Sequence, residues 1–280
     1  MTADSRKYDQ SSRSWQMQVD GAGLKWERVY DLAHPLHVGM ARHPNHPAFT
    51  FSLIRRHGDV LLGGGVTVAA ETFSMGGHTG THMDGLGHVA VGGRVHLDQD
   101  IMANQSYGEG LLVNSVHEHP PFMGPAHLVN MPELLGRELT TSDEIGPADL
   151  EAWFKGRPEP IPGSAVLIRT GWAKYQSDYV RYVGVRDGLP GVVPSAAKWL
   201  TDRGVRLVGS DTVAFEKMPT TDLPVHVHLL VKSGVPIMES LSLDAVARDG
   251  HYEFFLIVIP MPIRGGTASP VRPIALVSPR

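Results

Sequence analysis

Four runs of strand length stand out from the pattern of apolar and polar positions along the chain. They cover residues 66–75, 165–171, 205–211 and 254–263. The first is rich in β-branched and aromatic residues, and the other three are nearly continuous apolar runs, as is typical of buried strands. Pro260 and Pro262 interrupt the last run, which is too short to span a bilayer. The pattern therefore predicts β-strands, three of them in the core.

Glycine, proline and acidic residues mark two helices and one turn. A helix is predicted from about Pro147, with acidic residues in its first turn, and another begins near Ser195 and stops at Gly204. The second helix leads directly into the strand at 205–211. The triple glycine at 63–65 is not followed by Lys-Ser or Lys-Thr, so it predicts a hairpin turn and not a phosphate-binding loop.

No internal repeat, low-complexity tract or linker separates these elements, so we expect one mixed α/β domain over residues 26–280. Residues 1–25 are polar, and we expect them to form a flexible N-terminal arm that packs on a neighbouring subunit. They lack the apolar core of a signal peptide.

Composition narrows the class of protein. With 280 residues, 42% hydrophobic and 19% charged, the chain is typical of a globular protein, and we expect it in the cytoplasm. A net charge of −4 gives no reason to expect a nucleic acid or a membrane as partner. The absence of cysteine excludes thiolate ligands and nucleophiles, so any metal ion must be held by nitrogen and oxygen atoms.

One short segment gathers good metal ligands: GGHTGTHMDGLGH, residues 76–88. In an extended segment the side chains of His78, His82 and Asp84 project to one face, and in a helical turn His78 and His82 still share a face. Either geometry brings two imidazoles and a carboxylate to one point. A polar hydrogen-bonded turn or a chance cluster would contain the same residues, but the clustering favours a metal site.

The ligand types indicate the chemistry. Two imidazoles and one carboxylate suit Zn²⁺, Mn²⁺ or Fe²⁺ and leave positions open for water, as in catalytic sites. The segment is not the HExxH motif of zinc proteases, because Thr79 stands at the glutamate position. His88 is the nearest candidate for a general acid and base, since an imidazole titrates near neutral pH. The alternative for His88 is a surface histidine after a glycine-rich turn.

A second segment, residues 223–244, contains His226, His228 and Glu239. Glu239 ends an apolar run, and a buried carboxylate must meet a cation or a donor network. Only one of the two alternating histidines can face a given site.

The motif His78-x-Gly80-Thr81-His82-x-Asp84-x-x-x-His88 resembles the HxGTHxDxxxH signature of the cyclase family of metal-dependent hydrolases, which includes bacterial kynurenine formamidases and isatin hydrolases. Further stretches resemble the family in the same order: YDLAHPLHVGM, VLIRTGW, LVGSDT, HVHLLVKSGVPIMESLSLD and SPVRPIAL. The resemblance implies an α/β fold with a β-barrel-like mixed sheet flanked by helices, assembled as a homodimer or homotetramer.

The resemblance also implies the site residues. The implied metal ligands are His78, His82, Asp84, His226 and Glu239. Asp84 would bridge a first Zn or Mn ion to a second, and His88 matches the catalytic histidine. The spacing between His226 and Glu239 is one residue longer than in the formamidases. His228 is therefore an alternative ligand, and the number of bound ions, one or two, stays open.

The expected reaction is hydrolysis of a small cyclic or N-acyl amide. The formamidases of the family carry a Trp-Pro pair that contacts an aryl substrate, whereas this chain has His43 before Pro44. A lactam or lactone is therefore also a candidate substrate, and a cyclase or dehydratase a candidate activity. A metal-dependent binding protein without turnover is the alternative of another class. We expect Thr81 to hydrogen-bond a ligand carboxylate, and Gly80 to let the substrate approach the backbone.

Overall fold

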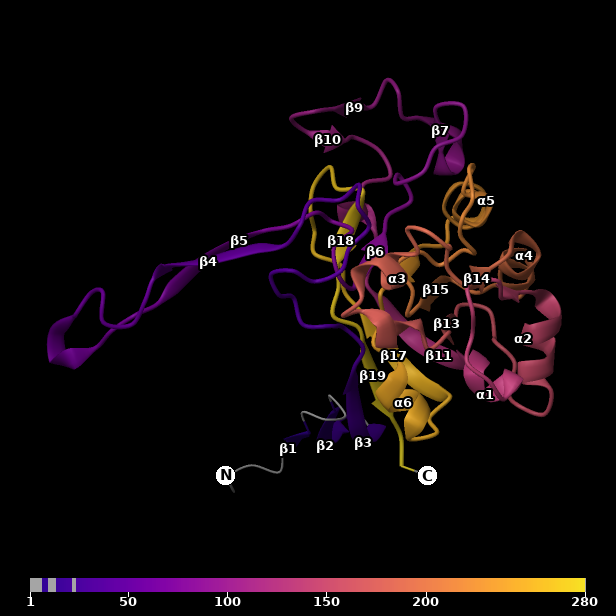
Figure 1. Cartoon of the computed structure of the whole chain (residues 1–280), viewed down its shortest axis with the longest axis horizontal. Helices are drawn as coiled ribbons and strands as arrows, with labels where there is room; N and C mark the ends of the chain where they lie inside the picture. Colours follow the sequence, from indigo (N-terminus) through magenta and orange to yellow (C-terminus); the bar gives the residue numbers. More distant parts are fainter. Residues whose placement is uncertain (1–6, 10–13, 22–23, 280) are drawn as a thin grey trace.

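An eleven-stranded mixed sheet runs through the molecule (Figure 1). The computed structural model describes residues 7–9, 14–21 and 24–279. In spatial order the strands are β1 (Lys7–Asp9), β2 (Ser14–Gly21), β3 (Leu24–Asp31), β19 (Ile274–Val277), β17 (Glu253–Val258), β11 (Phe122–Asn130), β13 (Ala165–Arg169), β15 (Leu207–Ser210), β16 (Ile237–Glu239), β6 (His82–Asp84) and β18 (Ala268–Pro270).

The middle of the sheet is parallel, and its flanks are antiparallel. Strands β11, β13, β15 and β16 pair in parallel, so the chain must cross over between them. The crossovers contain α1 (Met131–Leu135), α2 (Pro147–Phe154), α3 (Tyr179–Val183), α4 (Pro194–Asp202), α5 (Pro224–His226) and the π-helical turn η5 (Val227–Ser233). Helix α6 (Asp244–Arg248) follows β16.

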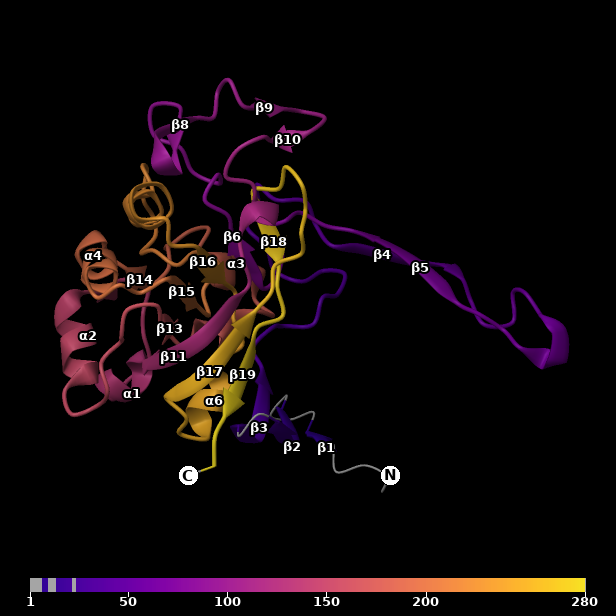
Figure 2. The same cartoon turned by 180° about the vertical axis from the view of Figure 1, so that it is seen from behind.

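Alternation along the central strands builds a core on each face of the sheet. Val166 and Ile168 of β13 pack in a cluster with residues of α2, α4 and η5. Ala165 and Leu167 point to the opposite face and join a cluster with residues of α6, β17 and β19. Figure 2 shows α2 and α4 on the side of the sheet away from α6. Burial on both faces explains why these strands are continuous apolar runs.

The remaining elements are small. Two-stranded pairs form between β12 (Glu144–Ile145) and β14 (Gly191–Val192), β7 (Arg94–Val95) and β8 (Gln99–Asp100), and β9 (Gln105–Ser106) and β10 (Gly110–Leu111). Single 3₁₀ turns lie at Gly63–Gly65, His96–Asp98, Val116–Glu118 and Trp172–Tyr175.

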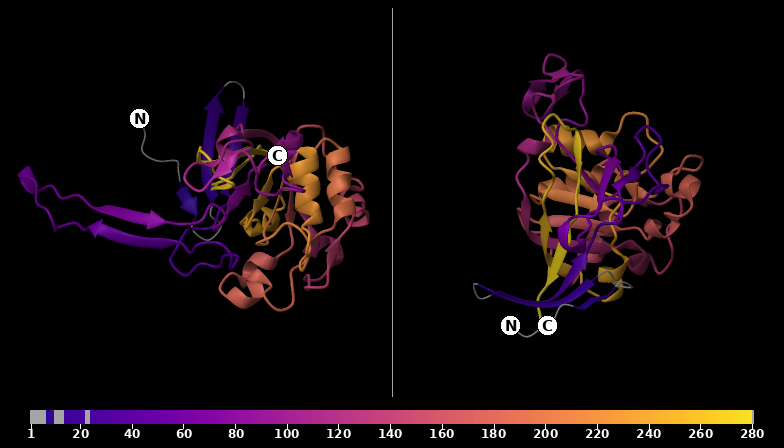
Figure 3. Two further views of the ribbon diagram at one scale, coloured as in Figure 1. Left: turned by 90° about the horizontal axis from the view of Figure 1, so that it is seen from above. Right: turned by 90° about the vertical axis from the view of Figure 1, so that its left-hand side faces the viewer.

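A two-stranded hairpin extends away from the body of the molecule (Figures 1 and 3). Strands β4 (Thr50–Arg55) and β5 (Ala70–Ser74) pair antiparallel, with the Gly63–Gly65 turn between them. We call residues 50–74 the β4–β5 arm. The predicted hairpin turn is confirmed, while the strand expected over 66–75 is shorter because only its second half pairs with β4.

The expected single domain with a barrel-like mixed sheet and flanking helices is confirmed, as a half-barrel. The buried strands predicted at 165–171 and 205–211 correspond to β13 and β15, and the two predicted helices to α2 and α4. The strand predicted at 254–263 is shorter than expected, because β17 ends at Val258 and Ile259, Met261 and Ile263 beyond it are exposed. The flexible arm expected over residues 1–25 lies partly outside the described residues; β1 and β2 pair with the sheet there, and its flexibility stays a prediction.

Candidate metal centre

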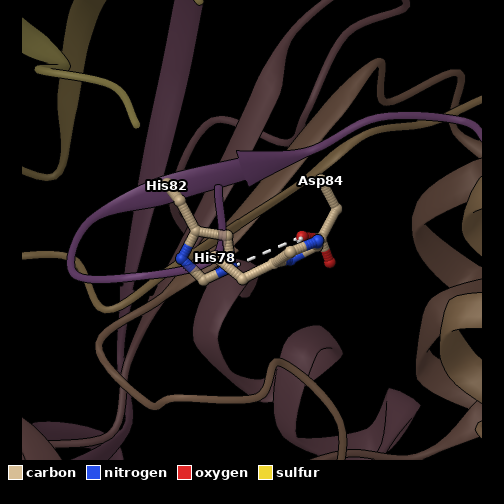
Figure 4. A group of neighbouring side chains, drawn as sticks. All are labelled: His78, His82 and Asp84. Carbon is tan, nitrogen blue, oxygen red and sulfur yellow. Dashed lines mark ion pairs between the residues drawn. The ribbon is translucent and has the colours of Figure 1, made fainter. Parts of the chain in front are cut away.

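Strand β6 and the turn before it place the first three candidate ligands, His78, His82 and Asp84 (Figure 4). His82 and Asp84 are two residues apart in β6, so their side chains leave the same face of the strand. The sequence predicted that His78 lies either in an extended segment with His82 and Asp84 or in a helical turn. The structure shows neither. His78 lies in a turn closed by a hydrogen bond from Thr79 N–H to Gly76 C=O, and Gly80 has a φ of +73°. The turn folds His78 back toward Asp84.

The three side chains converge within a few ångströms. His78 Nδ1 lies 2.7 Å from Asp84 Oδ1, and His82 Nε2 lies 3.4 Å from the same oxygen. All three residues are buried. Their ligand atoms lie within 4.8 Å of one another, as the ligands of a single cation would.

Strand pairing brings a second set of ligands to the same carboxylate. In the antiparallel register of β6 and β16, Glu239 is directly opposite His82, and Glu239 Oε2 lies 3.5 Å from His82 Nε2. His226, in the short helix α5, places its Nε2 atom 3.7 Å from Asp84 Oδ2 and 3.2 Å from Glu239 Oε1. Asp84, His226 and Glu239 thus form a second triad, which shares Asp84 with the first.

The other ring nitrogen of each histidine already has a partner. His78 Nε2 lies 3.0 Å from Thr267 Oγ1, and His82 Nδ1 lies 2.8 Å from the Gly80 carbonyl oxygen. His226 Nδ1 contacts the carboxylate of Glu216. Such partners fix the ring and leave the opposite nitrogen to face the centre, as is usual for metal-binding histidines.

Two buried atoms show that the cluster fits a cation. His82 Nε2 and Asp84 Oδ1 make no hydrogen bond of acceptable geometry to any described residue. Buried polar atoms without partners are rare in folded proteins because desolvation is costly. A divalent ion among these nitrogen and oxygen donors would satisfy both atoms.

The charges of the centre are mutually dependent. Burial alone would lower the pKa of His82 and of His226, but the carboxylates around each ring outweigh it and raise both pKa values to about 10. Burial would raise the pKa of Glu239, yet contacts with His226 and His82 hold it at about 2. Without a cation the imidazolium groups neutralise the carboxylates. A bound dication would replace those protons.

His88 sits beside both triads. Its ring centroid is 4.1 Å from that of His78 and 6.4 Å from that of His226. Burial lowers the pKa of His88 to about 4, although the Asp84 charge opposes this. The ring is therefore neutral at pH 7. Its partly buried position beside both triads excludes the alternative of a surface histidine.

A pocket of about 390 Å³ opens onto the centre. It is lined by His43, Asn45, His46, His78, His82, His88, Val213, Ala214, Met218, Thr220, Thr221, Leu223, His226 and Glu239. His46 stacks on His78 with ring centroids 4.5 Å apart. His43 also lines the pocket, so an imidazole takes part in its wall.

Three expectations are corrected or resolved by the structure. His228 is not a ligand, because residues two apart on a helix point in opposite directions and its Nε2 bonds to Thr201 Oγ1. The Thr81 hydroxyl donates to the Ser240 carbonyl and not to a ligand carboxylate. Gly80 does not border the pocket; a Cβ there would lie 2.9 Å from atoms of Leu36 and Met40, so its small size serves packing.

Sequence reasoning missed Glu216 and His46. A glutamate inside the apolar run VAFEKM was a signal for Glu216, since a buried carboxylate needs a partner. Nothing in the local pattern of His46 distinguished it from the other histidines.

Comparisons with known proteins bear on most of the chain. The Cyclase family model, described as "Putative cyclase", matches residues 30–217. The kynurenine formamidase of Bacillus cereus is 27% identical over 249 residues, which cover 89% of this chain and 97% of the relative. The crystal structure of a novel cyclase has a TM-score of 0.81 at 26% identity, over 89% of this chain and 86% of its own. The structure of isatin hydrolase A from Ralstonia solanacearum has a TM-score of 0.71 at 25% identity, and the match covers 90% of this chain and 92% of that protein.

Proposed function

The chain belongs to the Cyclase family, and from that membership and the geometry of the centre we propose that it is a metal-dependent hydrolase that cleaves the C–N bond of a small amide. One observation carries the proposal: two buried ligand triads share Asp84, and the neutral ring of His88 lies beside them on the pocket wall. The Bacillus relative is named for a formamidase and the Ralstonia relative for an isatin hydrolase, which supports amide hydrolysis.

Each residue has a role in this proposal. His78, His82 and Asp84 would hold one divalent ion, and Asp84, His226 and Glu239 would hold a second, with Zn or Mn as the metal. Bound cations supply Lewis acidity, which activates water and polarises a carbonyl group. His88 accepts the proton of the attacking water as the C–O bond forms, and donates it to the leaving nitrogen as the C–N bond breaks.

The pocket favours an uncharged substrate. Its described lining has Val213, Ala214, Met218 and Leu223 as an apolar wall, and it contains neither lysine nor arginine. Away from the metal centre, a substrate carboxylate would meet no lysine or arginine of the described lining and would pay for its desolvation. We therefore propose a compact cyclic or N-acyl amide without a charged group.

A substrate panel tests this assignment. With the metal-loaded protein, kcat/KM for neutral cyclic and N-acyl amides should exceed that for N-acyl amino acids of similar size by at least about tenfold, the cost of one poorly compensated polar group. The panel should include matched lactones. Activity on lactones alone would overturn the amide assignment, and equal rates on charged and neutral amides would overturn the substrate class.

We propose that the chain forms a homodimer or homotetramer through the β4–β5 arm. In the arm Phe51 lies opposite Phe73 and Leu53 is on the same face, and all three side chains are about half exposed or more. A two-stranded ribbon is marginally stable alone and needs a further surface to pack against. A second copy of the chain would cover both arms at once by two-fold symmetry.

Light scattering checks the role of the arm. The double variant Phe51→Glu/Leu53→Glu should scatter as a monomer of 30.4 kDa, whereas the wild type should scatter as an even multiple of that mass. Ser52→Glu/Thr72→Glu is the matched control, because those residues pair on the opposite face of the same ribbon. A monomeric wild type, or an unchanged mass for the apolar-face variant, would contradict the proposal.

The cytoplasmic location and the lack of a nucleic-acid partner stay predictions from the sequence. No helix in the described part of the chain has the length and apolar character needed to cross a membrane.

A further inference from the structure

Glu216 is a buried carboxylate outside both ligand triads. Only 1% of it is exposed, and it lies in the segment between β15 and α5. The backbone on either side is fixed to β14: Val192 N–H donates to the Phe215 carbonyl, and Lys217 N–H donates to the Val192 carbonyl. The carboxylate therefore projects from an anchored stretch of chain.

One oxygen of Glu216 holds His226 in two ways. Glu216 Oε1 accepts a hydrogen bond of 3.1 Å from the His226 backbone N–H and also contacts His226 Nδ1. His226 lies in the first turn of α5, where backbone N–H groups have no acceptor within the helix. The carboxylate thus fixes both the start of the helix and the plane of the ring.

The neighbouring residue fixes the other ligand of the second triad. Phe215 N–H donates to Glu239 Oε1 at 2.8 Å. Two consecutive residues, Phe215 and Glu216, therefore position both ligands that join Asp84 in that triad. Within the described residues, neither Phe215 nor Glu216 makes a hydrogen bond or ion pair with His78 or His82.

We propose that Glu216 is a positioning residue that makes the second cation site competent. In the metal-loaded protein it would hold His226 with Nδ1–H toward the Glu216 carboxylate, which leaves Nε2 to face Asp84 and Glu239. This inference rests on the proposed function. The histidines of the two sites differ in the partner of their second ring nitrogen. That partner is a backbone carbonyl for His82 and a hydroxyl for His78, whereas it is a carboxylate for His226. The carboxylate makes the His226 ring the more basic metal ligand.

Calorimetric titration of Zn²⁺ into the metal-free protein tests the inference. The wild type should bind two ions. Glu216→Gln keeps the shape of the side chain and an acceptor oxygen but removes the charge. It should lower the affinity for one of the two ions by about tenfold to a hundredfold and leave the affinity for the other unchanged. Proton–nitrogen NMR of the metal-loaded protein gives an independent readout, because the His226 Nδ1–H proton loses its charged acceptor in the variant and its resonance should move upfield.

Two further variants separate positioning from folding. Glu216→Asp retains the charge at a shorter reach and should recover part of the affinity for the weakened ion. Asp211→Asn is the matched control: Asp211 is also fully buried, but its carboxylate accepts from Thr170 and Gly171 and from no metal ligand. It should lower the melting temperature and still bind two ions.

Several results would overturn the inference. Wild-type affinities for both ions in Glu216→Gln would do so, as would equal weakening of both ions, or loss of the same ion in Asp211→Asn. A wild type that hydrolyses amides with one bound ion would remove the second site and leave the proposed function standing. A wild type that binds no ion and cleaves no amide would overturn the proposed function itself.

Discussion

Replacing His88 by alanine should lower kcat by at least about a hundredfold while the metal content stays that of the wild type. The ring contacts His78 and lines the pocket, but it belongs to neither ligand triad. Because burial holds its pKa at about 4, the ring is neutral and able to accept a proton from pH 5 upward. The acid limb of kcat should therefore lie below the ordinary pKa of histidine, and this limb should disappear in the variant.

The control for this variant is His228→Ala. His228 is two residues from His226, yet it bonds to Thr201 and does not line the pocket. Its loss should leave kcat within about twofold of the wild type, because the side chain is only partly buried and its contact with Thr201 lies outside the pocket. Full turnover in His88→Ala would contradict the hydrolytic mechanism, and a wild type without any turnover would favour a metal-dependent binding protein.

Asp84→Asn should reduce amide hydrolysis by at least about a thousandfold and remove bound metal from both triads. Asp84 is the only residue the two triads share, and an amide offers neither the charge nor two equivalent oxygens. Bound cations would supply several kcal/mol of transition-state stabilisation, which corresponds to this loss in rate. Metal analysis and kcat, measured on the same samples, check the prediction.

Chelation should have the same effect reversibly. Exhaustive dialysis against a chelator should abolish activity, and Zn²⁺ or Mn²⁺ should restore it, so the ion that restores it better identifies the cofactor. The control for Asp84→Asn is Asp143→Asn, because Asp143 pairs with Arg137 and belongs to neither triad. This control should keep its bound metal and its activity. Full activity after chelation would contradict the metal-dependent mechanism.

Short-range spacing was enough to predict the first triad. His82 and Asp84 alternate within a strand, so any extended backbone puts them on one face. The turn that carries His78 was not predicted, because it depends on the positive φ of Gly80 and on packing against Leu36 and Met40. The extended and the helical backbone both predicted that His78 lies close to His82 and Asp84. The position is as predicted, but the backbone that produces it is a turn.

The second triad depended on long-range pairing. Sequence alone left His226 and His228 open, because the choice follows from a helical backbone and from Thr201 on a different helix. Glu216 gives no local signal of its partner, since its contact with His226 requires the segment after β15 to dock on β14. Tertiary packing, and not residue type, made these assignments.

The antiparallel pairing of β6 with β16 sets His82 opposite Glu239. Side chains alternate between the faces of a sheet, so sliding one of these strands past the other by a single position would turn a whole set of ligands away. A one-residue insertion within β6 or β16 would therefore dismantle the centre even if the sheet still closed. Insertions at the tip of the β4–β5 arm would leave it intact, and the lineage of this protein should show length variation there and none in these two strands.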